Sequence, residues 1–219
     1  MASGEAEAEE IFTSYVPNNA PGGAHAHPDI VVEATSLSFV SPPPLRHHFL
    51  MLDHARVNQV VLNEGGLSDL QLELIGHALQ QTERRLENGA RMAFFNGDGA
   101  GVGKGRMIAG MILENILKGV KRAVWVSVSA DLVEDAKRDL RDVGALVDEI
   151  GTVGGIPVKV TSLNKCGYGT LADKPDYVEE GVLFVTYSGL VAKERGNNGS
   201  ISVARTRLDQ VLELHNCVT

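Results

Sequence analysis

The segment Phe94–Arg106, FFNGDGAGVGKGR, holds the residues most able to do chemistry, because it combines closely spaced glycines with a lysine. Glycine accepts positive φ angles and lets backbone N–H groups turn inward around an anion. A helix that starts directly after such a loop adds the positive end of its dipole. Lys104 would reach the β- and γ-phosphates of a nucleotide. The segment therefore predicts a phosphate-binding loop.

Two positions depart from the usual signature of such a loop, G-x-x-x-x-G-K-[ST]. Asp98 stands at its first glycine position, with Gly97 one residue early, and Gly105 replaces the serine or threonine whose hydroxyl binds Mg²⁺. Mg²⁺ then lacks one protein ligand, so the loop predicts nucleotide binding more strongly than it predicts hydrolysis. Two alternatives stay open: a turn that merely joins a strand to a helix, and a dinucleotide-type G-x-G-x-G loop. A lysine that opens a buried helix is unusual for the dinucleotide type.

The elements around the loop alternate between apolar strands and helices. Helices are predicted at 67–86, 106–118, 130–144 and 203–214, with Ser68 and Ser129 as N-caps. Strands are predicted at 92–96, 122–129, 156–160 and 181–187. This alternation indicates an α/β fold with a parallel sheet and helices on both faces.

Three regions divide the chain. Residues 1–28 are predicted to form an acidic, flexible arm, and residues 29–66 an extended lead-in with one short strand at 29–40 that ends at the prolines of SPPP. Residues 67–219 would form the lobe that carries the loop.

The composition favours a globular intracellular protein. The chain has 219 residues, 43% of them hydrophobic and 22% charged, and a formal net charge of -8. Any contact with nucleic acid must therefore be local. Cys166 and Cys217 are isolated and form no metal-ligand spacing. The acidic start is no signal peptide, and no apolar run approaches the roughly 18 residues of a membrane span, so no membrane contact is expected.

Polar residues elsewhere could complete an ATPase site. Translocase ATPases use an upstream glutamine to read the adenine edge, which would be Gln71 here, although a helical glutamine is more often a surface residue. Hydrolysis also requires a strand that ends in Asp-Glu. No Asp-Glu pair of this kind is expected in the 219 residues, because the strand at 181–187 ends without a carboxylate and Asp131 comes only after the helix cap that follows the strand at 122–129.

Five sequence blocks in order resemble the N-terminal ATPase region of the strawberry notch family, over about residues 11–214. They are HPDIVVEATSLSFVSPP (27–43), LSDLQLELIGHALQQ (67–81), FFNGDGAGVGKGRMIAGMILEN (94–115), AVWVSVSADLVEDAKRDLRDVGA (123–145) and GVLFVTYSGL (181–190). The GVGKGR form of the loop, with glycine in place of serine or threonine, is itself a feature of that family.

The resemblance implies a superfamily-2 helicase-like ATPase with two lobes of the three-layer P-loop (RecA-like) type, which uses ATP and Mg²⁺. Eukaryotic members are implied to regulate transcription or chromatin in the nucleus, with DNA or chromatin proteins as partners. By position, the implied nucleotide-binding residues are Gln71, Gly99, Gly101, Gly103, Lys104, Gly105 and Arg106. The implied nucleic-acid-facing residues, at the carboxyl ends of strands, are Ser127, Ser129, Thr186 and Tyr187, although helix caps and strand ends also explain these four.

The family pattern continues beyond Thr219, with a strand that ends in Asp-Glu-Cys-His and then a second lobe with an arginine finger. We therefore expect an incomplete first lobe, with no catalytic residues assigned and little hydrolysis by this chain alone. Two other functions stay open: a small P-loop phosphotransferase with Asp131 as the metal carboxylate, and a non-enzymatic interaction module.

Overall fold

The computed structural model describes residues 11–36, 42–147, 155–166, 171, 180–191 and 206–214. A hairpin of β1 (Phe12–Ser14) and β2 (Val32–Ala34) is followed by helices α1 (Leu50–Asp53) and α2 (Ala55–Asn58), a π-helical turn (Gln59–Asn63) and helix α3 (Asp69–Thr82). Next come α4 (Lys104–Leu117), β3 (Arg122–Ser127), α5 (Val133–Asp142), β4 (Ala145–Val147) and β5 (Ile156–Val158). The last elements are β6 (Val160–Ser162), β7 (Gly181–Thr186), α6 (Tyr187–Leu190) and α7 (Arg207–Leu214).

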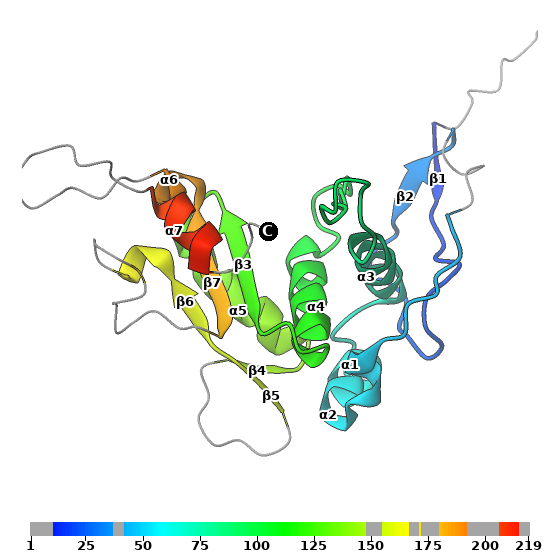
Figure 1. The fold of residues 1–219 in the computed structure, drawn as a ribbon. Helices are drawn as coiled ribbons and strands as arrows, with labels where there is room; N and C mark the ends of the chain where they lie inside the picture. The colour runs from blue at the N-terminus through cyan, green and yellow to red at the C-terminus, as the bar shows by residue number, and fades with distance from the viewer. Residues whose placement is uncertain are drawn as a thin grey trace, which may run out of the picture.

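The main sheet is parallel, in the order β3-β7-β6, and confirms the predicted α/β class. Residues of β7 alternate between two cores, as a strand covered on both faces requires. Val182 and Phe184 belong to the large core with α3, α4 and α5, whereas Leu183 and Val185 belong to a smaller core with Val211 of α7. Figure 1 shows α4 between this sheet and α3, with the β1–β2 hairpin beyond α3. The two remaining strands, β4 and β5, form a separate parallel pair.

The predicted helices form with shifted ends. α3 begins after Ser68, whose hydroxyl accepts from the backbone N–H of Gln71 while the Gln71 side chain accepts from the N–H of Ser68. This capping box confirms Ser68 as the N-cap. α4 begins at Lys104, two residues before the predicted start. Ser129 precedes a 3-10 turn (Ala130–Leu132) and makes no side-chain cap, so that cap prediction is wrong.

The strand predicted at 92–96 does not form. Its residues pair with no strand, and Phe95 is 89% exposed. At its start, Met92 N–H donates to the Arg84 carbonyl across a turn. An apolar run becomes a strand only when a neighbouring strand accepts its hydrogen bonds, and no strand among the described residues pairs with this segment.

The residues before α3 are more structured than their composition indicated. Only Val32–Ala34 of the strand predicted at 29–40 is extended and paired, with Phe12–Ser14 as its antiparallel partner, and residues 37–41 lie outside the described part. Residues 50–63 form short helical turns within the segment predicted to be extended. The start of the helix predicted at 203–214 also lies outside the description, which has α7 from Arg207. No helix in the described ranges has the length and apolar character needed to cross a membrane.

Candidate nucleotide-binding site

The loop before α4 takes a conformation that requires glycine at two positions. Gly101 and Gly103 have φ angles of +94° and +78°, in the left-handed region. A Cβ on Gly103 would also overlap the side-chain amide nitrogen of Gln71. The backbone can therefore turn sharply into α4, where the first N–H groups of the helix lack intrahelical acceptors.

Lys104, the first residue of α4, folds back over this loop. Its ammonium group donates to the backbone carbonyls of Asp98, at 3.0 Å, and Gly99, at 2.5 Å. The sequence predicted that Lys104 would lie beside the phosphate-binding loop. In the structure its ammonium group contacts the backbone of that loop. Burial raises the pKa of the nearby Asp98 carboxyl, against the opposing effects of Lys104 and Asn96.

Gln71 connects α3 to the loop. Its side chain is almost fully buried, its Oε1 accepts from the Ser68 N–H at 2.9 Å, and its Nε2 donates to the Val102 carbonyl at 3.0 Å. An amide group has two N–H donors and two acceptor lone pairs, so one of each makes no hydrogen bond with the part of the chain that the structure describes. Contact with an adenine edge stays a prediction, while a loop-positioning role is visible in these hydrogen bonds.

A cavity of about 580 Å³ opens beside the loop and brings the predicted residues together. All the predicted nucleotide-binding residues line it except Gly99, which contributes its carbonyl to Lys104. The lining also includes residues that were not predicted for the site, namely the stretch 25–29 and the α5 residues Arg138, Asp139 and Asp142.

The stretch 25–29 is fixed beside the start of α3. The Asp69 N–H donates to the His25 carbonyl at 2.7 Å, and His25 and Ser68 form a parallel bridge. The His27 ring is held by the backbone of Asp29, whose N–H donates to Nδ1 at 3.2 Å. This stretch therefore lines the cavity beside the start of α3.

Two acidic residues of α5 meet the first turn of α4. Arg106 donates through Nε and Nη2 to Asp142 Oδ2, at 3.2 and 2.7 Å. Asp139 lies three residues earlier on the same face of α5, and a Cβ on Gly105 would overlap its Oδ2. Burial raises the pKa of the Asp139 carboxyl, with Arg138 opposing the shift.

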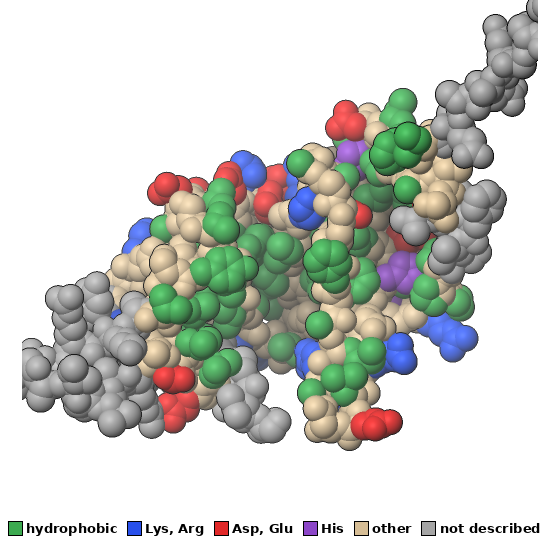
Figure 2. Space-filling view, turned by 90° about the horizontal axis from the view of Figure 1, so that it is seen from above, with side chains coloured by type: hydrophobic (Ala, Val, Ile, Leu, Met, Phe, Trp, Pro, Cys, Tyr) green, Lys and Arg blue, Asp and Glu red, His purple; other side chains and the backbone are tan. Residues whose placement is uncertain are grey.

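The residues predicted to face nucleic acid gather at the carboxyl edge of the sheet. Ser127 and Thr186 are direct partners in the β3–β7 register. Thr186 Oγ1 accepts from the Gly189 N–H at 3.0 Å, so it also caps α6. Tyr187 and Val128 are largely exposed there, and Figure 2 shows apolar side chains gathered on this side of the molecule. None of the four predicted residues lines the cavity beside the loop.

Comparison with known proteins decides the family. The family described as "P-loop containing NTP hydrolase pore-1" matches residues 26–216. "Protein strawberry notch homolog 1" of Gallus gallus is 46% identical over 204 residues, which is 93% of this chain and 15% of that protein. The chain belongs to the strawberry notch family.

Other relatives agree. "Protein strawberry notch homolog 1" of Homo sapiens is 45% identical over 93% of the chain and 13% of its own length. "Protein FORGETTER 1" of Arabidopsis thaliana is 40% identical over 94% of the chain and 14% of its own length. The chain thus spans about a seventh of these strawberry notch relatives. No solved structure matches it.

Three other carboxylates of this strawberry notch chain concern the phosphotransferase alternative and the Asp-Glu pair that hydrolysis requires. Asp131, the proposed metal carboxylate of a phosphotransferase, lies exposed in the 3-10 turn before α5 and does not line the cavity. The expectation that the chain has no Asp-Glu pair after a strand is wrong, because Asp148 and Glu149 directly follow β4, a strand that was not predicted. Both residues lie outside the described part of the chain.

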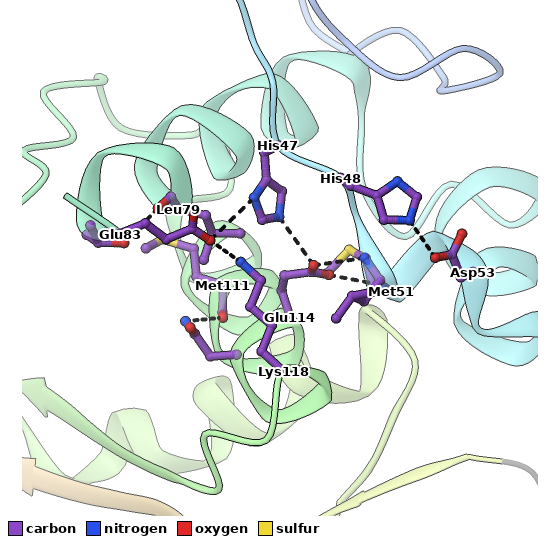
Figure 3. A network of polar contacts seen from close by, with 12 residues as sticks. His47, His48, Met51, Asp53, Leu79, Glu83, Met111, Glu114 and Lys118 are labelled. Atoms are coloured by element: carbon purple, nitrogen blue, oxygen red, sulfur yellow. Dashed lines mark hydrogen bonds and ion pairs between the residues drawn. The ribbon is translucent and has the colours of Figure 1, made fainter.

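A buried carboxylate behind the site was also missed. Glu114 of α4 is fully buried and accepts from the N–H groups of Leu50 and Met51, both at 2.8 Å. His47 Nε2 lies 3.2 Å from Glu114 Oε1, and the His47 ring also faces Glu83, which pairs with Lys118 (Figure 3). The only sequence signal was one glutamate within the apolar run MILENIL. This network fixes residues 47–51 to the helix that carries Lys104.

Proposed function

We propose that this chain binds ATP together with Mg²⁺, as the nucleotide-binding lobe of a helicase-like ATPase of the strawberry notch family. The observation that carries the proposal is the left-handed glycine loop with Lys104 at the first residue of α4. The family of P-loop NTP hydrolases to which the chain belongs supports the same ligand class.

The loop and α4 would hold the phosphates. Free N–H groups in the first turn of α4 point toward an anion placed before the helix, and the helix dipole favours its negative charge. Lys104 would exchange the carbonyls of Asp98 and Gly99 for phosphate oxygens, which form charge-assisted hydrogen bonds. The base would extend toward Gln71 and the stretch 25–29, where one amide N–H and one oxygen lone pair remain.

Bound Mg²⁺ would neutralise the phosphates and favour transfer of the terminal one. We propose that this chain alone hydrolyses ATP slowly. An arginine finger accelerates the step by about 10³- to 10⁵-fold. The chain spans only 13 to 15% of the two strawberry notch homologs described above, which leaves ample sequence in those relatives to supply such a group.

The resemblance further supports a role in regulating transcription or chromatin in the nucleus. DNA or chromatin proteins would then be the partners. Ser127, Ser129, Thr186 and Tyr187 would face the nucleic acid, since hydroxyl groups at strand ends suit phosphate contact. Their gathering at one edge of the β3–β7 pair is consistent with this proposal.

Equilibrium ATP binding in the presence of Mg²⁺ tests the proposal. Lys104→Ala should raise the dissociation constant at least about tenfold, because a charge-assisted phosphate contact is lost. Lys121→Ala is the matched control, since Lys121 pairs with Glu180 at the surface and does not line the cavity. If the wild-type chain binds no ATP at millimolar concentration, the proposal fails and a non-enzymatic interaction module is favoured.

A further inference from the structure

The structure shows what stands beside Gly105, where a conventional phosphate loop has a serine or threonine. A Cβ built on Gly105 would overlap Oδ2 of Asp139 and lie 3.0 Å from its Cγ. The carboxylate of α5 therefore occupies the space that a serine side chain would take. Glycine at position 105 is thus explained by packing, because a larger residue would collide with Asp139.

Two ion pairs position Asp139 and the part of α5 that carries it. Three residues further along α5, Asp142 pairs with Arg106 of α4, which fixes the two helices against each other at the loop. Arg138 Nη2 lies 3.4 Å from Asp139 Oδ1, which is the oxygen away from Gly105. The Asp139 side chain is only 14% exposed. Oδ2 is therefore left facing the start of α4, in the cavity that Lys104 also lines.

We propose that Asp139 supplies, from α5, the Mg²⁺ ligand that Gly105 cannot provide, so that the site takes a nucleoside triphosphate as its Mg²⁺ complex. This inference rests on the proposed function. Mg²⁺ in nucleotide sites is typically held by one or two carboxylates together with the substrate phosphates. Within the described residues, no group of three or more His, Cys, Asp or Glu side chains is placed to hold a metal ion. The ion would enter with the nucleotide, whose phosphates would supply further ligands.

A carboxylate at this position has a consequence that a hydroxyl does not have. With Mg²⁺ present, Asp139 binds the ion and favours the complex. Without Mg²⁺, the same negative charge lies beside the phosphates and repels them. Removing the charge should therefore weaken binding of the Mg²⁺ complex and strengthen binding of metal-free ATP.

The test is the ratio of ATP dissociation constants measured in EDTA and in Mg²⁺, by calorimetry on the 219-residue chain. Asp139→Asn keeps the shape of the side chain and removes its charge, and this variant should lower the ratio about tenfold or more. Glu134→Gln, an exposed carboxylate of the same helix, should leave the ratio unchanged. Mn²⁺ bound with ATP should also show altered electron paramagnetic resonance in Asp139→Asn.

A swap of the two positions sharpens the test. Gly105→Ser alone should weaken Mg²⁺–ATP binding, because the new side chain overlaps Asp139. Gly105→Ser combined with Asp139→Ala supplies the hydroxyl that a conventional loop has at this position, removes the overlap, and should recover affinity.

An unchanged ratio in Asp139→Asn, or increased affinity both with and without Mg²⁺, would overturn the inference while leaving ATP binding intact. If the wild-type chain binds no ATP at all, the proposed function is refuted, and this inference is refuted with it.

Discussion

Replacing Glu114 should destabilise the protein more than replacing any exposed carboxylate near it. In Glu114→Ala, the N–H groups of Leu50 and Met51 lose their charged acceptor in the interior. Hydrogen bonds to charged groups contribute about 1.5 to 3 kcal/mol each, so two of them give a loss of about 3 to 6 kcal/mol. The free energy of unfolding of a typical domain is about 5 to 15 kcal/mol, so this loss would remove a large part of the stability of the variant.

Urea unfolding measures this loss, with the fluorescence of the single tryptophan, Trp125, as the signal. Trp125 suits the purpose because its ring packs against Phe184 in the large core. Glu83→Ala is the control, since the Glu83 carboxylate is 59% exposed in its pair with Lys118, and surface pairs contribute at most about 1 kcal/mol. Equal losses in the two variants would refute the role assigned to Glu114.

Two further predictions concern the loop. Gly103→Ala should destabilise the fold by about 1 kcal/mol or more and should also weaken ATP binding. The reason is that Gly103 has a φ angle of +78° and that a Cβ there would overlap the Gln71 amide. Thermal unfolding measures the first effect and ATP titration the second. Asp98→Asn should be more stable than wild type at pH 7, because burial raises the pKa of Asp98 and so disfavours its charged form. The advantage should vanish as the pH falls below the ordinary value of 3.8, where the carboxyl is protonated in both folded and unfolded chains; an advantage that persists at pH 3 would contradict this cause.

Features whose structure is determined by residues close together in the sequence could be predicted from local sequence signals. Ser68 and Gln71 lie three residues apart, and their capping box sets the start of α3 from within one turn. The apolar run of β7 and the glycines before Lys104 act in the same way, because strand propensity and positive φ are properties of short segments. The family resemblance then extended these signals to the function.

Contacts between distant segments were not predictable in this way. The run 92–96 has strand composition but pairs with no strand among the described residues, and Phe94 and Phe95 are exposed. Asp139 meets Gly105 from another helix, and no spacing rule connects two residues that tertiary packing brings together. Glu114 likewise accepts from residues more than 60 positions earlier. These contacts depend on how the helices pack, which periodicity does not specify.

The most direct measurement is the crystal structure of the chain with a non-hydrolysable ATP analogue and Mg²⁺. The account predicts phosphates against the backbone N–H groups of residues 101–106, with the Lys104 ammonium turned from the carbonyls of Asp98 and Gly99 onto the phosphates. A nucleotide bound elsewhere, or a loop in which Lys104 keeps both carbonyl contacts, would contradict it.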